Sequence, residues 1–311
     1  YDNNTYTKYI TDVTLTSSAD IVSYAFYNCS SIVNFTFNKT DKIEIYAFSN
    51  VNFNNVNYYG TMDDWLNTKL VSESSNPISN VNTLHLIVDG KLQLFDGNLI
   101  INHKTTKISR YTFYRWNVIK SIKFGSNLRC IETDAFYQND IEKVYYDGTI
   151  EQLLSISTNS NIDIDLAMAS SNEGLFMLDD NNEYYQVTEI TIPESISTLK
   201  NLAGFDKVTS ITFGPYITSI YQGDLPALEN IYYKGSVSDW INAGSISRIT
   251  GINGLDKKLY FLDSNNSYDL IETLIIPEDV EVIPSGSFQH ISNIKDVVFN
   301  NTKIISEYAF A

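Results

Sequence analysis

The sequence predicts a strand-dominated α/β solenoid, whose stacked coils form a parallel β-strand ladder with short helices and linking β-segments between groups of coils. Two periodicities predict this fold. A ten-residue pattern occurs three times, over residues 56–65, 144–153 and 231–240, with a period of about 87 residues. Within each long period, a shorter apolar pattern returns roughly every 22 residues.

The shorter pattern reads apolar-x-x-apolar-x-apolar, and its last three residues alternate as in a half-buried strand. This is the strand part of a leucine-rich repeat, so we expect a strand ladder on the concave face of the solenoid. The copies are Ile10/Val13/Leu15, Ile32/Phe35/Phe37, Phe53/Val56/Tyr58, Val81/Leu84/Leu86, Ile119/Ile122/Phe124, Ile141/Val144/Tyr146, Val187/Ile190/Ile192, Val208/Ile211/Phe213, Leu228/Ile231/Tyr233, Ile271/Leu274/Ile276 and Ile294/Val297/Phe299.

A second motif precedes most strands: an apolar residue five positions before a phenylalanine, often with alanine just before the ring. No coil can bury its apolar set alone, so Phe48, Phe136 and Phe310 are expected in a core shared between neighbouring coils. The third long repeat departs from the motif, with Leu225 in place of phenylalanine and with Ala203-Gly204-Phe205 shifted by one residue. The regular pairs are Ile21/Phe26, Ile43/Phe48, Ile108/Phe113, Ile131/Phe136, Ile283/Phe288 and Ile305/Phe310.

A short helix is expected after the glycine of each ten-residue pattern. The segments Thr61-x-x-Asp64, Thr149-x-x-Gln152 and Ser236-x-x-Asp239 resemble capping boxes, and apolar residues follow at helical spacing. Trp65 and Trp240 fall on the apolar stripe, so burial against the solenoid is favoured over a role as exposed carbohydrate platforms.

Three further sequence strings are similar to those of a known repeat family. They are Ala-Phe-Tyr-Asn-Cys-Ser-Ser-Ile at 25–32, the Tyr-Tyr-x-Gly-Thr/Ser pattern, and Ile-Pro-Glu at 192–194 and 276–278. Together they resemble the BspA-like leucine-rich repeat surface protein family. Residues 86–92 look like that family's linking β-segment. The resemblance implies an adhesive, cell-surface or secreted protein.

The repeats divide the chain into four parts of one continuous solenoid fragment. We expect a partial unit over 1–83, units over 84–174 and 175–258, and a partial unit over 259–311. Solenoids normally carry polar capping units, and none is evident at either end. The sequence is therefore expected to be a fragment of a longer repeat protein.

Composition limits the possible partners. The chain has 311 residues, 43% of them hydrophobic, which is typical of a folded protein. With 37 acidic and 21 basic residues the net charge is −16, which argues against nucleic acid and anionic membranes as partners. No apolar run approaches the ~20 residues of a membrane-spanning helix.

Catalytic, cofactor and metal-binding motifs are absent from the sequence, so we expect no enzyme, no cofactor and no metal. His85 should point outward from a strand, and His103 and His290 should lie in loops, all as surface residues. Cys29 and Cys130 are too far apart in sequence to suggest a motif and are expected to be buried free thiols.

Two acidic segments, 179–183 and 263–266, lie between expected strands. Asp and Asn favour turns there, and a calcium site remains an alternative because oxygen ligands cluster.

The outward side chains of the ladder are the candidate ligand face, because stacked strands form an extended platform. A mixed surface of Tyr, Asn, Lys and Asp suits polar recognition. The expected function is a non-catalytic, monomeric adhesion module that binds a protein or glycan on host, matrix or neighbouring cells. A passive spacer is the alternative, and a glycosidase with paired carboxylates is a third possibility. The candidate residues are Asn55, Asn57, Tyr59, Lys143, Tyr145, Asp147, Asn230, Tyr232 and Lys234.

Overall fold

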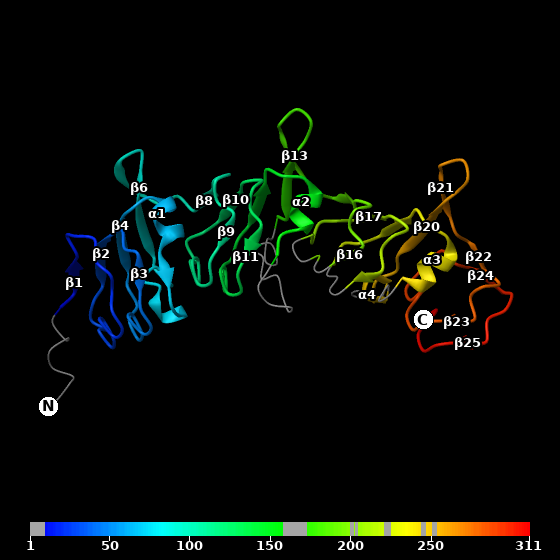
Figure 1. Cartoon of the computed structure of the whole chain (residues 1–311), viewed down its shortest axis with the longest axis horizontal. Helices are drawn as coiled ribbons and strands as arrows, with labels where there is room; N and C mark the ends of the chain where they lie inside the picture. The colour runs from blue at the N-terminus through cyan, green and yellow to red at the C-terminus, as the bar shows by residue number, and fades with distance from the viewer. Residues whose placement is uncertain are drawn as a thin grey trace. The chain divides into compact units, whose positions relative to one another are not determined.

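The computed structural model describes residues 10–157, 173–199, 202, 205–220, 225–243, 247–250 and 254–311. The chain folds into two compact units, Tyr1–Asp147 with Ile156–Asn172, and Gly148–Ser155 with Glu173–Ala311. Both consist of stacked coils that each add a strand to a parallel ladder (Figure 1). The predicted strand-dominated solenoid is confirmed.

The first unit contains two groups of parallel strands. In the first group the strands run in the order β1-β2-β4-β6, and β7 then pairs with β6 as an antiparallel hairpin. In the second group β8, β10 and β12 are parallel. The bounds are β1 Asp12–Thr14, β2 Asn34–Asn38, β4 Asn55–Tyr59, β6 Thr83–Val88, β7 Lys91–Leu94, β8 Asn98–Ile101, β10 Ser121–Phe124 and β12 Lys143–Tyr146.

The second unit repeats this plan. The hairpin β13–β14 is followed by the parallel strands β15, β17, β19 and β20, the last of which forms an antiparallel hairpin with β21. The parallel pair β22–β24 follows. The bounds are β13 Leu175–Leu178, β14 Tyr184–Gln186, β15 Glu189–Thr191, β17 Ser210–Phe213, β19 Asn230–Tyr233, β20 Lys258–Leu262, β21 Tyr268–Leu270, β22 Thr273–Ile276 and β24 Asp296–Phe299.

Short two-residue strands form smaller parallel ladders within the coils. They are β3 Lys42–Ile43 with β5 Lys69–Leu70, β9 Lys107–Ile108 with β11 Cys130–Ile131, β16 Thr198–Leu199 with β18 Ser219–Ile220, and β23 Val282–Ile283 with β25 Ile304–Ile305. A 3-10 turn, η1, covers Glu73–Ser75, and a short helix, α4, covers Ser247–Thr250.

Each predicted short helix is present, and its cap explains where it begins. The helices are α1 Met62–Asn67, α2 Ile150–Leu154 and α3 Val237–Asn242, preceded by Thr61, Thr149 and Ser236 as capping-box residues. The helix lengthens its coil: Asn55 pairs with Thr83 across α1, whereas Asn34 pairs with Asn55 where no helix intervenes. The extra length is about two helical turns.

The core is continuous between coils, as the phenylalanine motif predicts. Phe26 stacks on Phe48 with ring centroids 5.3 Å apart, and Phe113 stacks on Phe136 at 5.0 Å. In the second unit Phe288 and Phe310 stack in the same way at 5.3 Å, but Phe310 is 36% exposed, so its expected burial in the core is wrong. Each ring therefore packs against its equivalent in the adjacent coil.

Two residues in the left-handed backbone region flank the phenylalanine of a regular coil. Around Phe136 they are Asp134, with φ of 60°, and Gln138, with φ of 54°. Glycine occupies the first of these positions at Gly286, with φ of 69°, because this conformation is least strained without a Cβ. The paired positions bend the chain around each buried ring.

The two tryptophans on the helices are buried and are not carbohydrate platforms. The side chains of Trp65 and Trp240 are 0% exposed. The indole N–H of Trp65 donates to the backbone oxygen of Thr112, and that of Trp240 to the oxygen of Ser287, both at 2.9 Å. Each buried tryptophan thus anchors its helix to the core, and its polar N–H is satisfied by a hydrogen bond.

Several single-residue expectations need correction or qualification. Neither Cys29 nor Cys130 is in a disulfide, but both are half-buried, so the prediction of buried thiols is wrong in that respect. Leu225 and Phe205 are buried despite the irregular motif, while Ala203 and Gly204 lie outside the described residues. Leucine thus replaces phenylalanine without exposing the coil's apolar interior.

The histidines lie where the strand and loop pattern predicts, with one qualification. His103 is exposed in a turn, and His290 is partly exposed. His85 points outward from β6 but is only partly exposed, because its Nδ1 atom is covered. Neighbouring strand side chains therefore shield a histidine that the sequence alone suggests is solvated.

Candidate functional site

The nine candidate residues share one side of the ladders, which we call the open face. Along β4, β12 and β19 the intervening residues are buried, whereas these nine are partly or fully exposed. Strand alternation is the cause, because successive side chains point to opposite sides. Asn55, Asn57 and Tyr59 come from β4; Lys143 and Tyr145 from β12, with Asp147 after it; Asn230 and Tyr232 from β19, with Lys234 after it.

In the first unit the open face carries a ladder of side-chain amides. The Nδ2 of Asn34 donates to Asp12 Oδ1 at 2.6 Å, and the Nδ2 of Asn55 donates to Asn34 Oδ1 at 2.7 Å. In the next row Asn57 Nδ2 donates to Thr36 Oγ1 at 3.1 Å. Hydrogen bonds from Thr11 and then Asn34 lower the pKa of Asp12. Many polar side chains of this surface are therefore hydrogen-bonded to one another.

The strands β10 and β12 carry charges on the open face. Lys123 Nζ lies 3.3 Å from Asp147 Oδ2, and the strand register places Lys123 beside Tyr145. Ser121 Oγ donates to Asn98 Oδ1 at 2.7 Å. The ion pair is partly exposed, so it contributes little to stability but fixes the position of the lysine.

In the second unit the open face carries a tyrosine cluster. Tyr232 stacks on Tyr260 with ring centroids 4.6 Å apart, and the ring of Tyr268 meets Tyr232 edge-on at 5.0 Å. Burial raises the pKa of Tyr232, and the neighbouring Tyr260 and Glu189 raise it further. Of these three tyrosines, only Tyr232 is predicted from the sequence. The alternation of residues 258–262 was the available signal for Tyr260.

A slot of about 600 Å³ opens beside this cluster, and all of its lining belongs to the second unit. Tyr232 and Tyr268 line it together with hydroxyl side chains of β15 and β17 and with Glu189. Tyr185 of the β13–β14 hairpin and Ile150 of α2 complete it. Both hairpins of this unit, which project from the ladder in Figure 1, therefore contribute a tyrosine.

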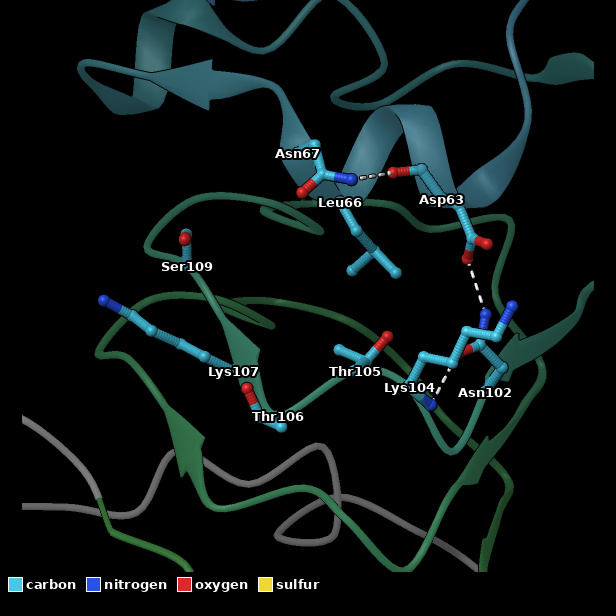
Figure 2. A pocket seen from close by; sticks show the side chains of 9 residues that line it. All are labelled: Asp63, Leu66, Asn67, Asn102, Lys104, Thr105, Thr106, Lys107 and Ser109. Carbon is cyan, nitrogen blue, oxygen red and sulfur yellow. Dashed lines mark hydrogen bonds between the residues drawn. The ribbon is translucent and has the colours of Figure 1, made fainter.

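A second hollow of about 450 Å³ lies under α1 in the first unit (Figure 2). The amide of Asn102 donates to Asp63 Oδ1 at 2.6 Å, and Leu66 points from the helix toward Thr105. Lys107 also lines the hollow, and its Nζ atom forms an ion pair with Glu132 Oε1 at 2.6 Å.

Comparable bridges join the other two helices to the coil that follows. Ser195 Oγ donates to Glu151 Oε1 at 2.6 Å below α2, and Ser238 Oγ of α3 donates to Asp279 Oδ1 at 3.0 Å. Because the bridge recurs at the three capped helices α1, α2 and α3, we assign the contacts around the hollow in Figure 2 to holding the helix in place.

The acidic segments between strands serve as turns. Asp179 Oδ1 accepts the backbone N–H of Asn181 at 2.8 Å, and Asp263 Oδ1 accepts that of Asn265 at 2.9 Å. Backbone hydrogen bonds lower the pKa of both carboxyl groups. Across the described residues, no group of three or more His, Cys, Asp or Glu side chains is placed to hold a metal ion.

Repeated coils with a strand ladder and an outward polar face define a solenoid repeat protein. The family model described as BspA type leucine rich repeat region matches six copies in this chain, over residues 3–77, 97–203 and 261–311. The chain therefore belongs to the BspA type leucine-rich repeat family. Solenoids of this kind are typically non-catalytic interaction modules.

Two solved structures are similar at low sequence identity. A leucine rich cell surface protein from Faecalibacterium prausnitzii A2-165 is 13% identical, with a TM-score of 0.37 over 93% of this chain and 88% of its own. A leucine-rich repeat protein from Bacteroides ovatus ATCC 8483 is 16% identical, with a TM-score of 0.36 over 95% and 82%. No curated protein matches the chain. Among the described residues, no helix has the length and apolar character needed to cross a membrane.

Proposed function

We propose that the chain is a non-catalytic adhesion module of a cell-surface or secreted protein. In this proposal the open face binds ligands on host cells, extracellular matrix or neighbouring cells. Membership of the BspA type family supports a role in interaction. The observation that carries the proposal is the cluster of Tyr232, Tyr260 and Tyr268 beside strands β15 and β17, whose outward residues are polar.

The chemistry of the open face suits recognition. The backbones of β17 and β19 are paired with strands on both sides, so these strands offer only side chains to a ligand. Tyrosine provides a large contact area, a polar tip and little conformational entropy to lose. The net charge of −16 disfavours polyanionic ligands and favours neutral or basic ones.

A spacer role is the second candidate, and the amide ladder of the first unit favours it. Asn34 and Asn55 satisfy each other across strands, which leaves less hydrogen-bonding capacity for a ligand. In this alternative the repeats act as a passive spacer that holds another domain away from the cell.

The test is binding of the purified chain to surfaces coated with fibronectin, laminin or collagen and to intact epithelial and bacterial cells. We expect saturable binding that falls at least about tenfold when Tyr145 and Tyr232 are both replaced by alanine. Tyr216→Ala is the matched control, because Tyr216 is 60% exposed in the turn after β17. Equal binding by the double variant and the wild type, or no binding above background, contradicts the proposal.

A further inference from the structure

In one row of outward side chains across the second unit, small residues on two strands are followed by large aromatic residues on the next two. The register aligns Thr191, Thr212, Tyr232 and Tyr260 on neighbouring strands β15, β17, β19 and β20. One face of the Tyr232 ring is covered by Tyr260, at 4.6 Å. Its other side faces Thr212 on the adjacent strand β17, which is too short to cover it, so Tyr232 forms an aromatic wall of the slot.

The floor of the slot is made of hydroxyl groups. Thr191, Thr212 and Ser210 point to the open face from two adjacent strands and line the slot together. Strands are about 4.8 Å apart, so the floor between the wall and the edge of β15 is about 10 Å wide. Such a floor offers hydrogen-bond donors and acceptors but no deep apolar pocket.

The slot is lined almost entirely by uncharged residues. Of the nine residues that line it, all within the described chain, only Glu189 is charged at neutral pH. A carboxylate accepts hydrogen bonds and repels anions. A ligand that fits must therefore donate hydrogen bonds toward Glu189 and carry no negative charge.

We propose that this slot binds a sugar ring of a neutral glycan. The apolar C–H face of the ring stacks on Tyr232, while its hydroxyls bond to the floor hydroxyls and to Glu189. An extended peptide is a poorer fit over the floor and wall, because the backbones of β17 and β19 are paired with strands on both sides. The inference rests on the proposed function, since it takes the open face to be the binding surface.

Equivalent rows of the first unit lack this arrangement. The residue at the place of Tyr232 is Asn57 on β4, which bonds to Thr36. On β12 it is Tyr145, whose neighbour Lys123 is long and is held by Asp147. Tyr145 therefore faces a long cationic side chain, whereas Tyr232 faces threonine.

The test is titration of the full chain with neutral oligosaccharides, followed by calorimetry and by saturation-transfer NMR. The probes are cellotriose, mannotriose, N-acetyllactosamine and chitotriose, with 3′-sialyllactose and a polygalacturonate trimer as acidic counterparts. We expect saturable binding of at least one neutral probe and much weaker binding of the acidic ones.

Two slot variants and one control give the expected pattern. Tyr232→Ala should weaken binding at least about tenfold, because the stacking wall is lost. Thr212→Tyr should block the slot by extending the row of rings. Tyr216→Ala should bind like the wild type, because Tyr216 lies in the turn after β17 and does not line the slot. Circular dichroism and the urea midpoint establish that each variant is folded.

The outcomes separate this inference from the proposed function. No binding by any neutral probe overturns the glycan inference, as does equal binding by the Tyr232→Ala or Thr212→Tyr variant. If the chain still adheres to a coated surface or cell in that case, the adhesion proposal stands. Binding of a lysine-containing peptide that Thr212→Tyr abolishes, without glycan binding, would assign the slot to a peptide and overturn the inference.

Discussion

The indole N–H of Trp65 donates a 2.9 Å hydrogen bond to the backbone oxygen of Thr112, which ties a six-residue helix to the next group of coils. Trp240 makes the same bond to Ser287 in the second unit. A helix this short is marginal by itself in water, so tertiary packing of its buried ring must stabilise it. The helix is thus an attachment between groups of coils.

This bond predicts the effect of removing the ring. Trp240→Ala should lower the free energy of unfolding by about 3–5 kcal/mol, because a buried aromatic ring leaves a cavity. Trp240→Phe should cost less, since it keeps much of the apolar contact and loses the hydrogen bond to Ser287. Urea unfolding followed by circular dichroism measures both, and an unchanged midpoint for Trp240→Ala would show that the helix is not anchored by its ring.

The capping boxes predict a dependence of stability on acid. Hydrogen bonds from the Ser236 side chain and backbone lower the pKa of Asp239 below its ordinary value of 3.8. A folded pKa below the unfolded one stabilises the fold above pH 4, and this contribution is lost as the pH falls through the folded pKa. Wild type should therefore exceed Asp239→Asn in urea midpoint at pH 6, and the difference should shrink toward pH 2. In a Ser236→Ala background, the difference in urea midpoint between Asp239 and Asp239→Asn should be smaller. A difference between wild type and Asp239→Asn that does not change with pH would contradict this account.

The buried tyrosine of the Tyr-Tyr pair predicts a neutral or favourable substitution. The Tyr146 hydroxyl is buried without a hydrogen-bond partner among the described residues, and burial raises its pKa to about 12. Tyr146→Phe removes an unsatisfied polar group and keeps the ring. The urea midpoint should stay constant or rise. A clear loss of stability would reveal a partner for this hydroxyl, and Tyr145→Phe on the open face is the matched control.

The glycine of the ten-residue pattern predicts a steric penalty. A Cβ placed on Gly235 would lie 2.7 Å from the ring of Tyr233, closer than packed atoms approach. Gly235→Ala should therefore destabilise the fold by about 1–3 kcal/mol. Gly214→Ala is the control, because its nearest contact would be 3.4 Å from the flexible side chain of Glu194. Equal midpoints for the two variants would argue against close packing of the tyrosine.

Local signals account for what the sequence predicts correctly. The alternation around Val144 and the capping box at Thr149 depend only on neighbouring residues, so both strand and helix are predicted. Local signals do not predict the slot. It depends on which residues of distant coils lie side by side, such as Thr212 beside Tyr232, and on Tyr268 returning from a hairpin. Helix insertions change the coil length, so this register is not evident from one repeat.

Solvent exposure is also poorly predicted where it depends on neighbouring coils. Cys29 is half-buried and burial raises its pKa, although a cysteine outside any motif was expected to be a fully buried thiol. His85 is partly covered for the same reason. The division of the chain at residues 83, 174 and 258 remains a prediction, to be tested by excising single repeat units.

The most direct test of the stacked core is a double-mutant cycle between Phe113 and Phe136, whose rings stack 5.0 Å apart in adjacent coils. Urea unfolding of Phe113→Leu, Phe136→Leu and the double variant should give a coupling of about 0.5–1.5 kcal/mol. The pair Phe48 and Phe136, which belong to coils that are not adjacent, should give additive effects. Additive effects for Phe113 and Phe136 would contradict a core shared by successive coils.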